Sequence, residues 1–406
     1  MTVTSLPHPA GVALDSPRCW RILIDTRSPW LVEFASALAA TVPTRVFSPS
    51  ISVWGRFERD EARPVTLRNI SVTQFPLQRG YFSPYLSPLV LEDGRILSRL
   101  LSNDADDRTP LVCCLPHYAR IAERWPGPVI YYATDLFRAY SGWNPTHISA
   151  LERRICQTAA LVCPNSTRIA DILVRDSACD PNRILVLPNA VREENLQPEP
   201  PTCPAPLPPD AANLQRPVAG VIGNLAENTD WELIEQTVQA TPWLSWLLVG
   251  PHSEPVNDRR QADARQRLLN TGGRVRFTGP KDYGDLKDYA RAFDVAILPY
   301  RKREPTYSGS STRFYEHLAA CRPMVATRGF EELIQKPPAL QLANTSEEFV
   351  EALESLRSVA FEDGLSELRW KMSQQNTWKV RAQEMCRSLQ YGIGPSESAL
   401  ESRIHA

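Results

Sequence analysis

The sequence predicts an α/β protein made of two doubly wound domains that face each other across a cleft. At 406 residues the chain exceeds one typical domain, which favours two. Short apolar runs alternate with helical patterns, and several runs are apolar throughout, as expected for parallel strands covered by helices on both faces. A proline-rich segment, residues 196–217, interrupts the alternation, which then restarts. Together these observations predict two α/β halves joined by a linker.

The N-terminal domain is expected over residues 1–195. Its first strand is expected at residues 20–25, and a helix follows at residues 31–40. Further strands are expected at residues 45–50, 70–77, 111–116, 128–135, 160–166 and 183–189, with helical patterns around 148–158 and 167–174. Two of these strands end in an aspartate, Asp25 and Asp135, so each carboxylate is expected at the carboxyl edge of the sheet.

Residues 196–217 are the expected linker, because proline fixes φ and lacks the N–H that a helix or central strand needs. The C-terminal domain is expected over residues 218–375. Its strands are expected at 218–223, 246–250, 274–279, 294–300 and 324–329, and its helices at 231–240, 285–292 and 346–356. Residues 376–406 are expected to form a helix at 377–389 and a tail. Ligands of such folds bind where the carboxyl ends of the strands face the cleft.

Composition excludes several classes of function. The net charge is −1 and no basic block occurs, so no nucleic-acid partner is expected. Nine cysteines and six histidines are dispersed without a C-x-x-C pair, which favours reduced thiols and predicts no metal site. The start lacks a signal-peptide pattern and no run of about 18 apolar residues exists, so a cytoplasmic location without membrane spans is expected.

The segment YSGSSTRFYEHLAACRP, residues 307–323, combines hydroxyl residues, a charged pair and an apolar helical stripe. A helix from about Ser311 places Arg313 and Glu316 on one face. Free N–H groups, hydroxyls and the helix dipole make its start a ready anion site. The residues expected there are Ser308, Gly309, Ser310, Ser311 and Thr312. The alternative is an ordinary N-cap with a surface Arg–Glu pair.

Residues 294–300, DVAILPY, the hydroxyl-rich loop and residues 313–327, RFYEHLAACRPMVAT, resemble the donor-binding signature of GT-B glycosyltransferases. The resemblance implies two Rossmann-like domains, a nucleotide-diphosphate-sugar donor and a hydroxyl acceptor. It also implies that Glu316 contacts the nucleotide ribose and that the loop before it contacts the diphosphate. Residues 375–389 resemble the closing helix that crosses back to the N-terminal domain in these enzymes.

The chain departs from the retaining family-4 pattern of two glutamates separated by seven residues, since Ser308 stands at the first position. Gly223 is followed by Asn224, without the basic residues that many members carry there. Arg313 is therefore the expected partner of the diphosphate. No D-x-D motif is evident, so neither a metal nor another cofactor is expected. The departures favour inversion over retention.

The loop SSTR, residues 310–313, and the run VIYYATD, residues 129–135, resemble the glucuronosyltransferase type of xanthan assembly. In that type the corresponding aspartate is proposed as catalytic base, and inversion requires such a group to take the acceptor proton. Asp135 is therefore the expected base, with a helix cap or an acceptor-orienting residue as the alternative. Asp25 is the rival base.

Four more residues are expected near the donor. Gly223 and Gly250 end strands where a missing side chain lets the backbone approach a ligand, although turn geometry alone also explains such glycines. Lys281 follows a strand and is expected to line the base pocket, against the alternative of a plain loop. Tyr300 is expected near the donor sugar or in the core.

These observations predict a GT-B glycosyltransferase of bacterial polysaccharide or glycoconjugate synthesis, with UDP-sugar as the favoured donor and a glycan, glycolipid or small hydroxyl acceptor. A non-catalytic nucleotide-sugar-binding partner, a GT-B epimerase and a phosphorylase stay open. The apolar residues 81–101 and the nearby arginines are expected to be domain core and solvated surface, with peripheral contact at the inner face of the membrane as the alternative. Those arginines are Arg56, Arg59, Arg63, Arg68 and Arg79.

Overall fold

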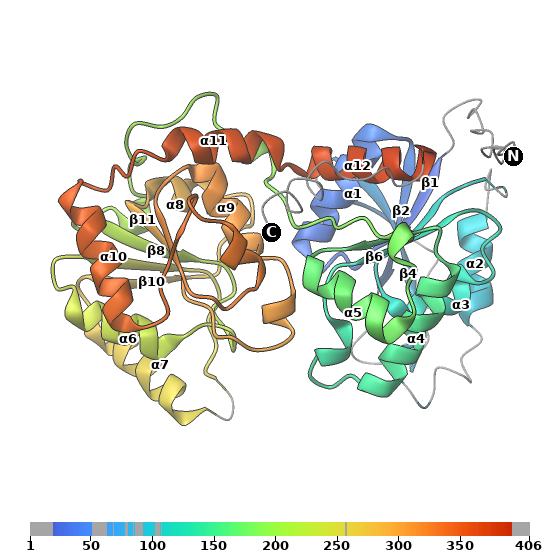
Figure 1. Cartoon of the computed structure of the whole chain (residues 1–406), viewed down its shortest axis with the longest axis horizontal. Coiled ribbons are helices and arrows are strands. Elements are labelled where there is room, and N and C mark those ends of the chain that lie inside the picture. The colour runs from blue at the N-terminus through green and yellow to red at the C-terminus, as the bar shows by residue number, and fades with distance from the viewer. Residues whose placement is uncertain are drawn as a thin grey trace, which may run out of the picture.

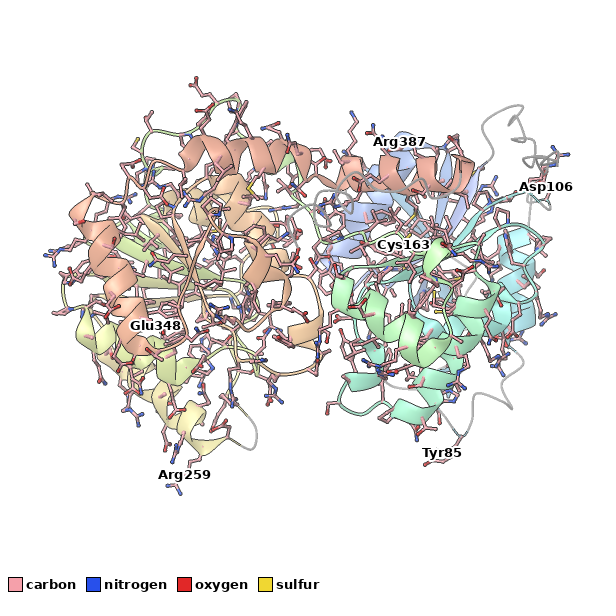
Figure 2. The ribbon with its side chains drawn as sticks, in the orientation of Figure 1. Tyr85, Asp106, Cys163, Arg259, Glu348 and Arg387 are labelled. Atoms are coloured by element: carbon pink, nitrogen blue, oxygen red, sulfur yellow. The ribbon has the colours of Figure 1, made fainter. Side chains whose placement is uncertain are left out.

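The computed structural model describes residues 19–50, 63–67, 69–77, 80–83, 85, 92–101, 106, 108–255 and 258–391. Two α/β domains lie side by side, and each consists of a sheet with helices packed against it (Figure 1). Buried and exposed side chains separate as the sequence pattern predicts: Cys163 is fully buried within the N-terminal domain, whereas Arg259 projects from the outer surface of the other domain (Figure 2).

The N-terminal sheet has the strand order β3-β4-β2-β1-β5-β6-β7, and all pairs are parallel except β3 with β4. Its strands are β1 Trp20–Leu23, β2 Thr44–Ser50, β3 Arg63–Leu67, β4 Ile70–Pro76, β5 Leu111–Cys113, β6 Val129–Ala133 and β7 Leu161–Pro164. Its helices are α1 Pro29–Thr41, α2 Glu92–Leu101, α3 Ala119–Ala122, α4 Pro145–Thr158 and α5 Thr167–Ser177. All five residues of β6 are buried, because apolar clusters cover both faces of the sheet.

The C-terminal sheet is parallel throughout, in the order β10-β9-β8-β11-β12-β13. Its strands are β8 Val218–Ile222, β9 Ser245–Val249, β10 Val275–Gly279, β11 Val295–Leu298, β12 Met324–Ala326 and β13 Gln341–Leu342. Its helices are α6 Trp231–Ala240, α7 Arg259–Thr271, α8 Leu286–Ala292, α9 Thr312–Ala320, α10 Ser346–Ser358 and α11 Ser366–Gln375. The strand order reverses between β8 and β11, and such a switch point opens a crevice for a ligand at the carboxyl ends of the strands.

The chain passes between the domains twice, and the two passages lie against each other. The Val191 amide donates to the Asn376 carbonyl at 2.8 Å, and the Trp378 amide donates to the Val191 carbonyl at 3.1 Å. Helix α12, Trp378–Tyr391, then packs on α1 of the N-terminal domain (Figure 1). Its Trp378 is fully buried in the same cluster as Phe34. The last helix therefore closes the chain back onto the first domain.

One expectation changes at the level of elements. Residues 183–189 form no regular strand: they run beside β7 with one isolated bridge, and the amides of Leu185 and Leu187 donate to carbonyls of β7. The next amide in register, that of Asn189, donates instead to the Ser310 hydroxyl. Within residues 81–101, the apolar side chains that the structure describes are mainly core, since Tyr81, Ile96 and Leu100 are buried.

The alternative of a peripheral membrane contact is not tested by these residues. The arginines Arg56, Arg59, Arg68 and Arg79, and the side chain of Arg63, lie outside the described residues. Across the ranges that the structure does describe, no helix combines the length and the apolar character that crossing a bilayer demands.

Candidate functional site

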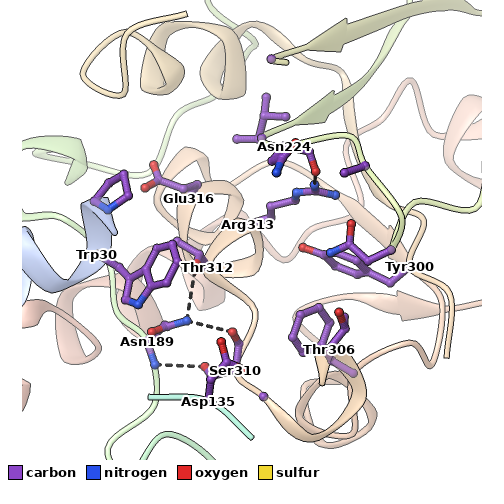
Figure 3. Close-up of a pocket in the computed structure, with 18 of the residues that line it drawn as sticks. Trp30, Asp135, Asn189, Asn224, Tyr300, Thr306, Ser310, Thr312, Arg313 and Glu316 are labelled. Carbon is purple, nitrogen blue, oxygen red and sulfur yellow. Dashed lines mark hydrogen bonds between the residues drawn. The ribbon is translucent and has the colours of Figure 1, made fainter. Parts of the chain in front are cut away.

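A cavity of about 760 Å³ lies where the carboxyl ends of the two sheets meet, and both domains line it (Figure 3). The N-terminal domain contributes Arg27, Trp30, Thr134, Asp135, Tyr140 and Asn165. The C-terminal domain contributes, among others, Gly223, Asn224, Gly250, Lys281, Tyr300, Gly309, Ser310, Thr312, Arg313 and Glu316. The structure thus brings together most of the residues that the sequence singles out.

Arg313 is a buried cation in the first turn of α9. It lines the cavity with only 8% of its surface exposed, and its guanidinium lies 5.0 Å from the centre of the Tyr300 ring. Its Nη2 donates to the carbonyl of Asn224, whereas its Nη1 is buried without a hydrogen-bond partner in the described part of the chain. A buried cation with an unused donor at a helix N-terminus is suited to an anion.

Gly223 and Gly250 make room for this arrangement. Gly223 has φ +104°, and a Cβ added there would lie 2.7 Å from Nε of Arg313. Gly250 has φ +126°, and its added Cβ would lie 2.1 Å from the Gly223 carbonyl oxygen. Both positions therefore require glycine for conformation and for space, and at Gly223 the neighbour that takes the space is Arg313.

Ser308 and Ser311 do not line the cavity. Ser311 is the N-cap of α9: its hydroxyl accepts from the Phe314 amide and hydrogen-bonds the Tyr300 hydroxyl at 3.1 Å. The Ser308 hydroxyl donates to Glu304 at 2.7 Å and accepts from Nε of Arg168, on α5 of the other domain, at 2.9 Å. Because the hydroxyls of both serines are engaged in fixing local structure, they are not positioned to bind a ligand.

Ser310 and Thr312 line the cavity and also join the domains. Asn189 donates through its amide N–H to the Ser310 hydroxyl at 3.0 Å and through its side chain to the Thr312 hydroxyl at 3.1 Å (Figure 3). Ser166 similarly donates to the Ser308 carbonyl. The loop before α9 is therefore held against the N-terminal domain.

Glu316 lines the cavity one turn further along α9 and is 5% exposed. Its Oε2 accepts from Nδ2 of Asn195 at 2.6 Å and from Nη2 of Arg192 at 3.2 Å. These partners belong to the first passage between the domains, so Glu316 is held by residues more than 120 positions away in the sequence.

Asp135 lies just beyond the carboxyl end of β6 and faces the loop before α9. Its Oδ2 accepts from the Tyr140 hydroxyl at 2.5 Å, and a Cβ added to Gly309 would lie 3.5 Å from its Oδ1. Burial raises the pKa of Asp135 to about 6, although the Tyr140 hydrogen bond opposes the rise. This carboxylate is ionised near neutral pH and can accept a proton from a hydroxyl group in the cavity.

Asp25 does not line the cavity, which removes it as the rival base. Arg27 donates to its carboxylate through Nε at 2.9 Å and through Nη2 at 2.6 Å. The Asp25 carboxylate is therefore engaged by Arg27 and is not directed into the cavity.

The remaining expected residues have structural partners of their own. Lys281 forms an ion pair with Asp210 at 2.7 Å, so its charge is already balanced beside the cavity. Tyr300 lies under Arg313 and hydrogen-bonds the N-cap serine. Trp30, Tyr140 and Asn165 also line the cavity and were not predicted from the sequence, although each stands shortly after a strand that ends at the cleft. No group of three or more His, Cys, Asp or Glu side chains that could hold a metal occurs among the residues described.

Comparison with known proteins points to one group. Residues 216–358, about a third of the chain, match the family model described as "Glycosyl transferases group 1". "Putative teichuronic acid biosynthesis glycosyltransferase TuaH" of Bacillus subtilis (strain 168) is 24% identical over 164 residues. That match spans 40% of this chain and 40% of the curated relative, so it leaves more than half of each uncompared.

Solved structures are similar over almost the whole chain. HepE of Anabaena in complex with UDP and glucose has a TM-score of 0.66 at 16% identity and covers 93% of this chain and 100% of its own. Sucrose-phosphate synthase from Thermosynechococcus elongatus has a TM-score of 0.69 at 13% identity and covers 91% and 98%. At such identities the likeness shows the fold: the chain has the two-domain GT-B architecture that the sequence predicted.

Proposed function

We propose that this chain is a glycosyltransferase that moves a sugar from a nucleotide-diphosphate donor, with UDP favoured, to a hydroxyl acceptor. The observation that carries the proposal is one cavity lined both by a buried, partly unpaired Arg313 of the C-terminal domain and by the Asp135 carboxylate of the N-terminal domain. The structures of HepE with UDP and of HepE with UDP-glucose support the choice of UDP.

The donor would lie along the C-terminal wall. The diphosphate would sit at the start of α9 against Arg313, and Glu316 would accept from the ribose hydroxyls. The base would occupy the space beside Gly250 and Lys281, after β9 and β10. The likeness to the xanthan glucuronosyltransferase type supports this layout but does not assign the sugar.

The transfer would be a single displacement with inversion. The acceptor hydroxyl oxygen forms a bond to the anomeric carbon, the bond from that carbon to the diphosphate oxygen breaks, and Asp135 takes the hydroxyl proton. The nucleoside diphosphate leaves with the bonding electrons, and Arg313 and the α9 N-terminus stabilise its charge without a metal ion. Enclosure between the domains limits hydrolysis of the donor.

The first test is ligand-induced stabilisation. UDP at about 100 times its dissociation constant should stabilise the fold by about 2.7 kcal/mol, and the melting temperature should rise more with UDP than with GDP or TDP. Slow release of UDP from a UDP-sugar without acceptor would then separate an enzyme from a non-catalytic nucleotide-sugar-binding partner. If no nucleoside diphosphate shifts the melting temperature, the proposal fails. Conversion of the donor to an epimeric nucleotide sugar would instead indicate an epimerase.

Gly223→Ala should weaken UDP binding by about tenfold or more, because the new methyl group displaces the Arg313 guanidinium and disturbs its charge-assisted hydrogen bonds. Gly364→Ala is the matched control, since Gly364 has φ +73° but nothing within 4 Å of an added Cβ. Calorimetric titration with UDP measures both variants. Equal affinity of the two would show that Gly223 serves backbone conformation alone.

A further inference from the structure

The first chain passage between the domains, residues 189–195, is more than a connection, because it sends three side chains toward the cavity. Asn189 holds the hydroxyls of Ser310 and Thr312. Arg192 and Asn195, at the other end of the passage, both donate to Oε2 of Glu316. The passage therefore contacts both the start of α9 and its second turn.

Arg192 is almost fully buried, although it belongs to a segment that connects the two domains. Its side chain is 1% exposed, and its guanidinium lies 4.3 Å from the centre of the Tyr283 ring. Besides Glu316 it pairs through Nη1 with Glu194 at 2.9 Å. Burial alone would lower the pKa of Arg192, but Glu316, Tyr283 and Glu194 together outweigh burial, and the pKa is raised. Arg192 is thus a fixed positive charge behind Glu316.

The chemistry of ribose recognition explains why Glu316 needs such a partner. A carboxylate binds two vicinal hydroxyls only when it is ionised and held in one orientation, since both hydroxyls donate to it. Desolvation disfavours an ionised carboxylate at 5% exposure unless donors compensate it. The bonds from Arg192 and Asn195 use two of its roughly four acceptor positions, and the hydroxyl of Tyr283 lies near the same carboxylate. Glu316 also lines the cavity, so part of its acceptor capacity faces a ligand.

We propose that Arg192 is a positioning residue for the nucleotide: it holds the Glu316 carboxylate oriented toward the ribose hydroxyls. The inference rests on the proposed function, because it takes Glu316 as the ribose contact. It adds that the nucleotide site is complete only while the first interdomain passage is seated against α9. Since the two passages join the domains, occupancy of the ribose site is coupled to the relative position of the domains.

The test compares UDP with 2′-deoxy-UDP by calorimetric titration of the full chain. The wild type should bind UDP about 10–100-fold more tightly, as expected for a hydroxyl hydrogen bond to a charged group. In Arg192→Met this preference should fall to about twofold or less, through weaker UDP binding, whereas Arg192→Lys should restore part of it. The matched control is Arg322→Met, because Arg322 is a similarly buried arginine, 2% exposed, in the domain that holds Glu316, but it pairs with Glu362 and does not line the cavity.

The possible outcomes distinguish failure of the proposed function from failure of the positioning role of Arg192. If the wild type binds no nucleoside diphosphate, the proposed function itself fails. If the wild type binds UDP and 2′-deoxy-UDP equally, or if Arg192→Met keeps the wild-type preference, the positioning role is overturned while the proposed function stands. Should Arg192→Met not fold, Asn195→Ala removes the shorter bond to Glu316, and its preference must fall; an unchanged preference overturns the inference.

Discussion

Replacing Asp135 with asparagine is expected to lower the rate of sugar transfer by about 10²–10⁴-fold, the usual contribution of a general base. The side chain keeps its shape but loses the ability to take a proton. UDP affinity should change by less than about twofold, because Asp135 belongs to the N-terminal domain and makes none of the hydrogen bonds of Arg313. Single-turnover transfer assays and calorimetric titration with UDP measure the two effects separately.

The pH dependence of the transfer rate tests the same assignment independently. Burial raises the pKa of Asp135 to about 6, so the carboxyl is neutral below that pH and charged above it. Only the charged form accepts the proton, so the wild-type transfer rate should fall about tenfold for each pH unit below about 6. The rate of Asp135→Asn should show no such fall, because the group that titrates is gone.

Asp25→Asn is the matched control, since it makes the same chemical change at the end of another strand of the same sheet. Asp25 is paired with Arg27 and does not line the cavity, so its replacement should alter the transfer rate by less than about threefold. A transfer rate in Asp135→Asn close to that of the wild type would refute the base assignment and leave Asp135 an acceptor-orienting residue. The anomeric configuration of the product, read by NMR, independently tests inversion.

The fold was predictable because most of its strands carry a strong local signal. VIYYA in β6 is apolar throughout, and the structure buries all five residues between two helical layers. Helix α7 has no such signal: in RRQADARQRLLNT only Gln261, Ala264 and Leu268 are buried, which is too sparse a stripe to recognise. Residues 183–189 gave the opposite error: this apolar run lies beside β7 and donates two backbone hydrogen bonds to it, but the pairing is too short to form a regular strand.

The site was predictable where its parts are neighbours in the sequence and not where they are distant. Arg313 and Glu316 share one helix, so their proximity follows from helical spacing. The bonds from Arg192 to Glu316, from Asn189 to Ser310 and from Arg168 to Ser308 join residues 121–140 positions apart, and a single sequence holds no record of such contacts. Ser308 is an example of such an unpredicted contact. It stands where the family motif has a glutamate, and in the fold its hydroxyl donates to the carboxylate of Glu304, a residue that the motif does not include.

Replacing Arg313 with methionine is expected to weaken UDP binding by about 10–100-fold, and to lower the transfer rate by about 10²–10³-fold because the leaving charge grows in the transition state. Arg313→Lys should recover only part of the loss, since an ammonium keeps the charge without the planar fork of donors. Calorimetric titration should show that uridine, which lacks phosphate, binds the wild type and Arg313→Met about equally. The matched control is Arg274→Met, because Arg274 also donates to backbone carbonyls in this domain but lies outside the cavity.

The expectation for Arg313 is strong because the other cations lining this cavity in the described chain already have partners. Arg27 is paired with Asp25 and Lys281 with Asp210, whereas Nη1 of Arg313 lacks a hydrogen-bond partner among the described residues. A diphosphate therefore gains more from Arg313 than from either neighbour, which would have to leave an existing ion pair. If Arg313→Met bound UDP as the wild type does, while Arg27→Met or Lys281→Met did not, the diphosphate would lie away from the α9 N-terminus. The donor would then have to be placed anew in the cleft.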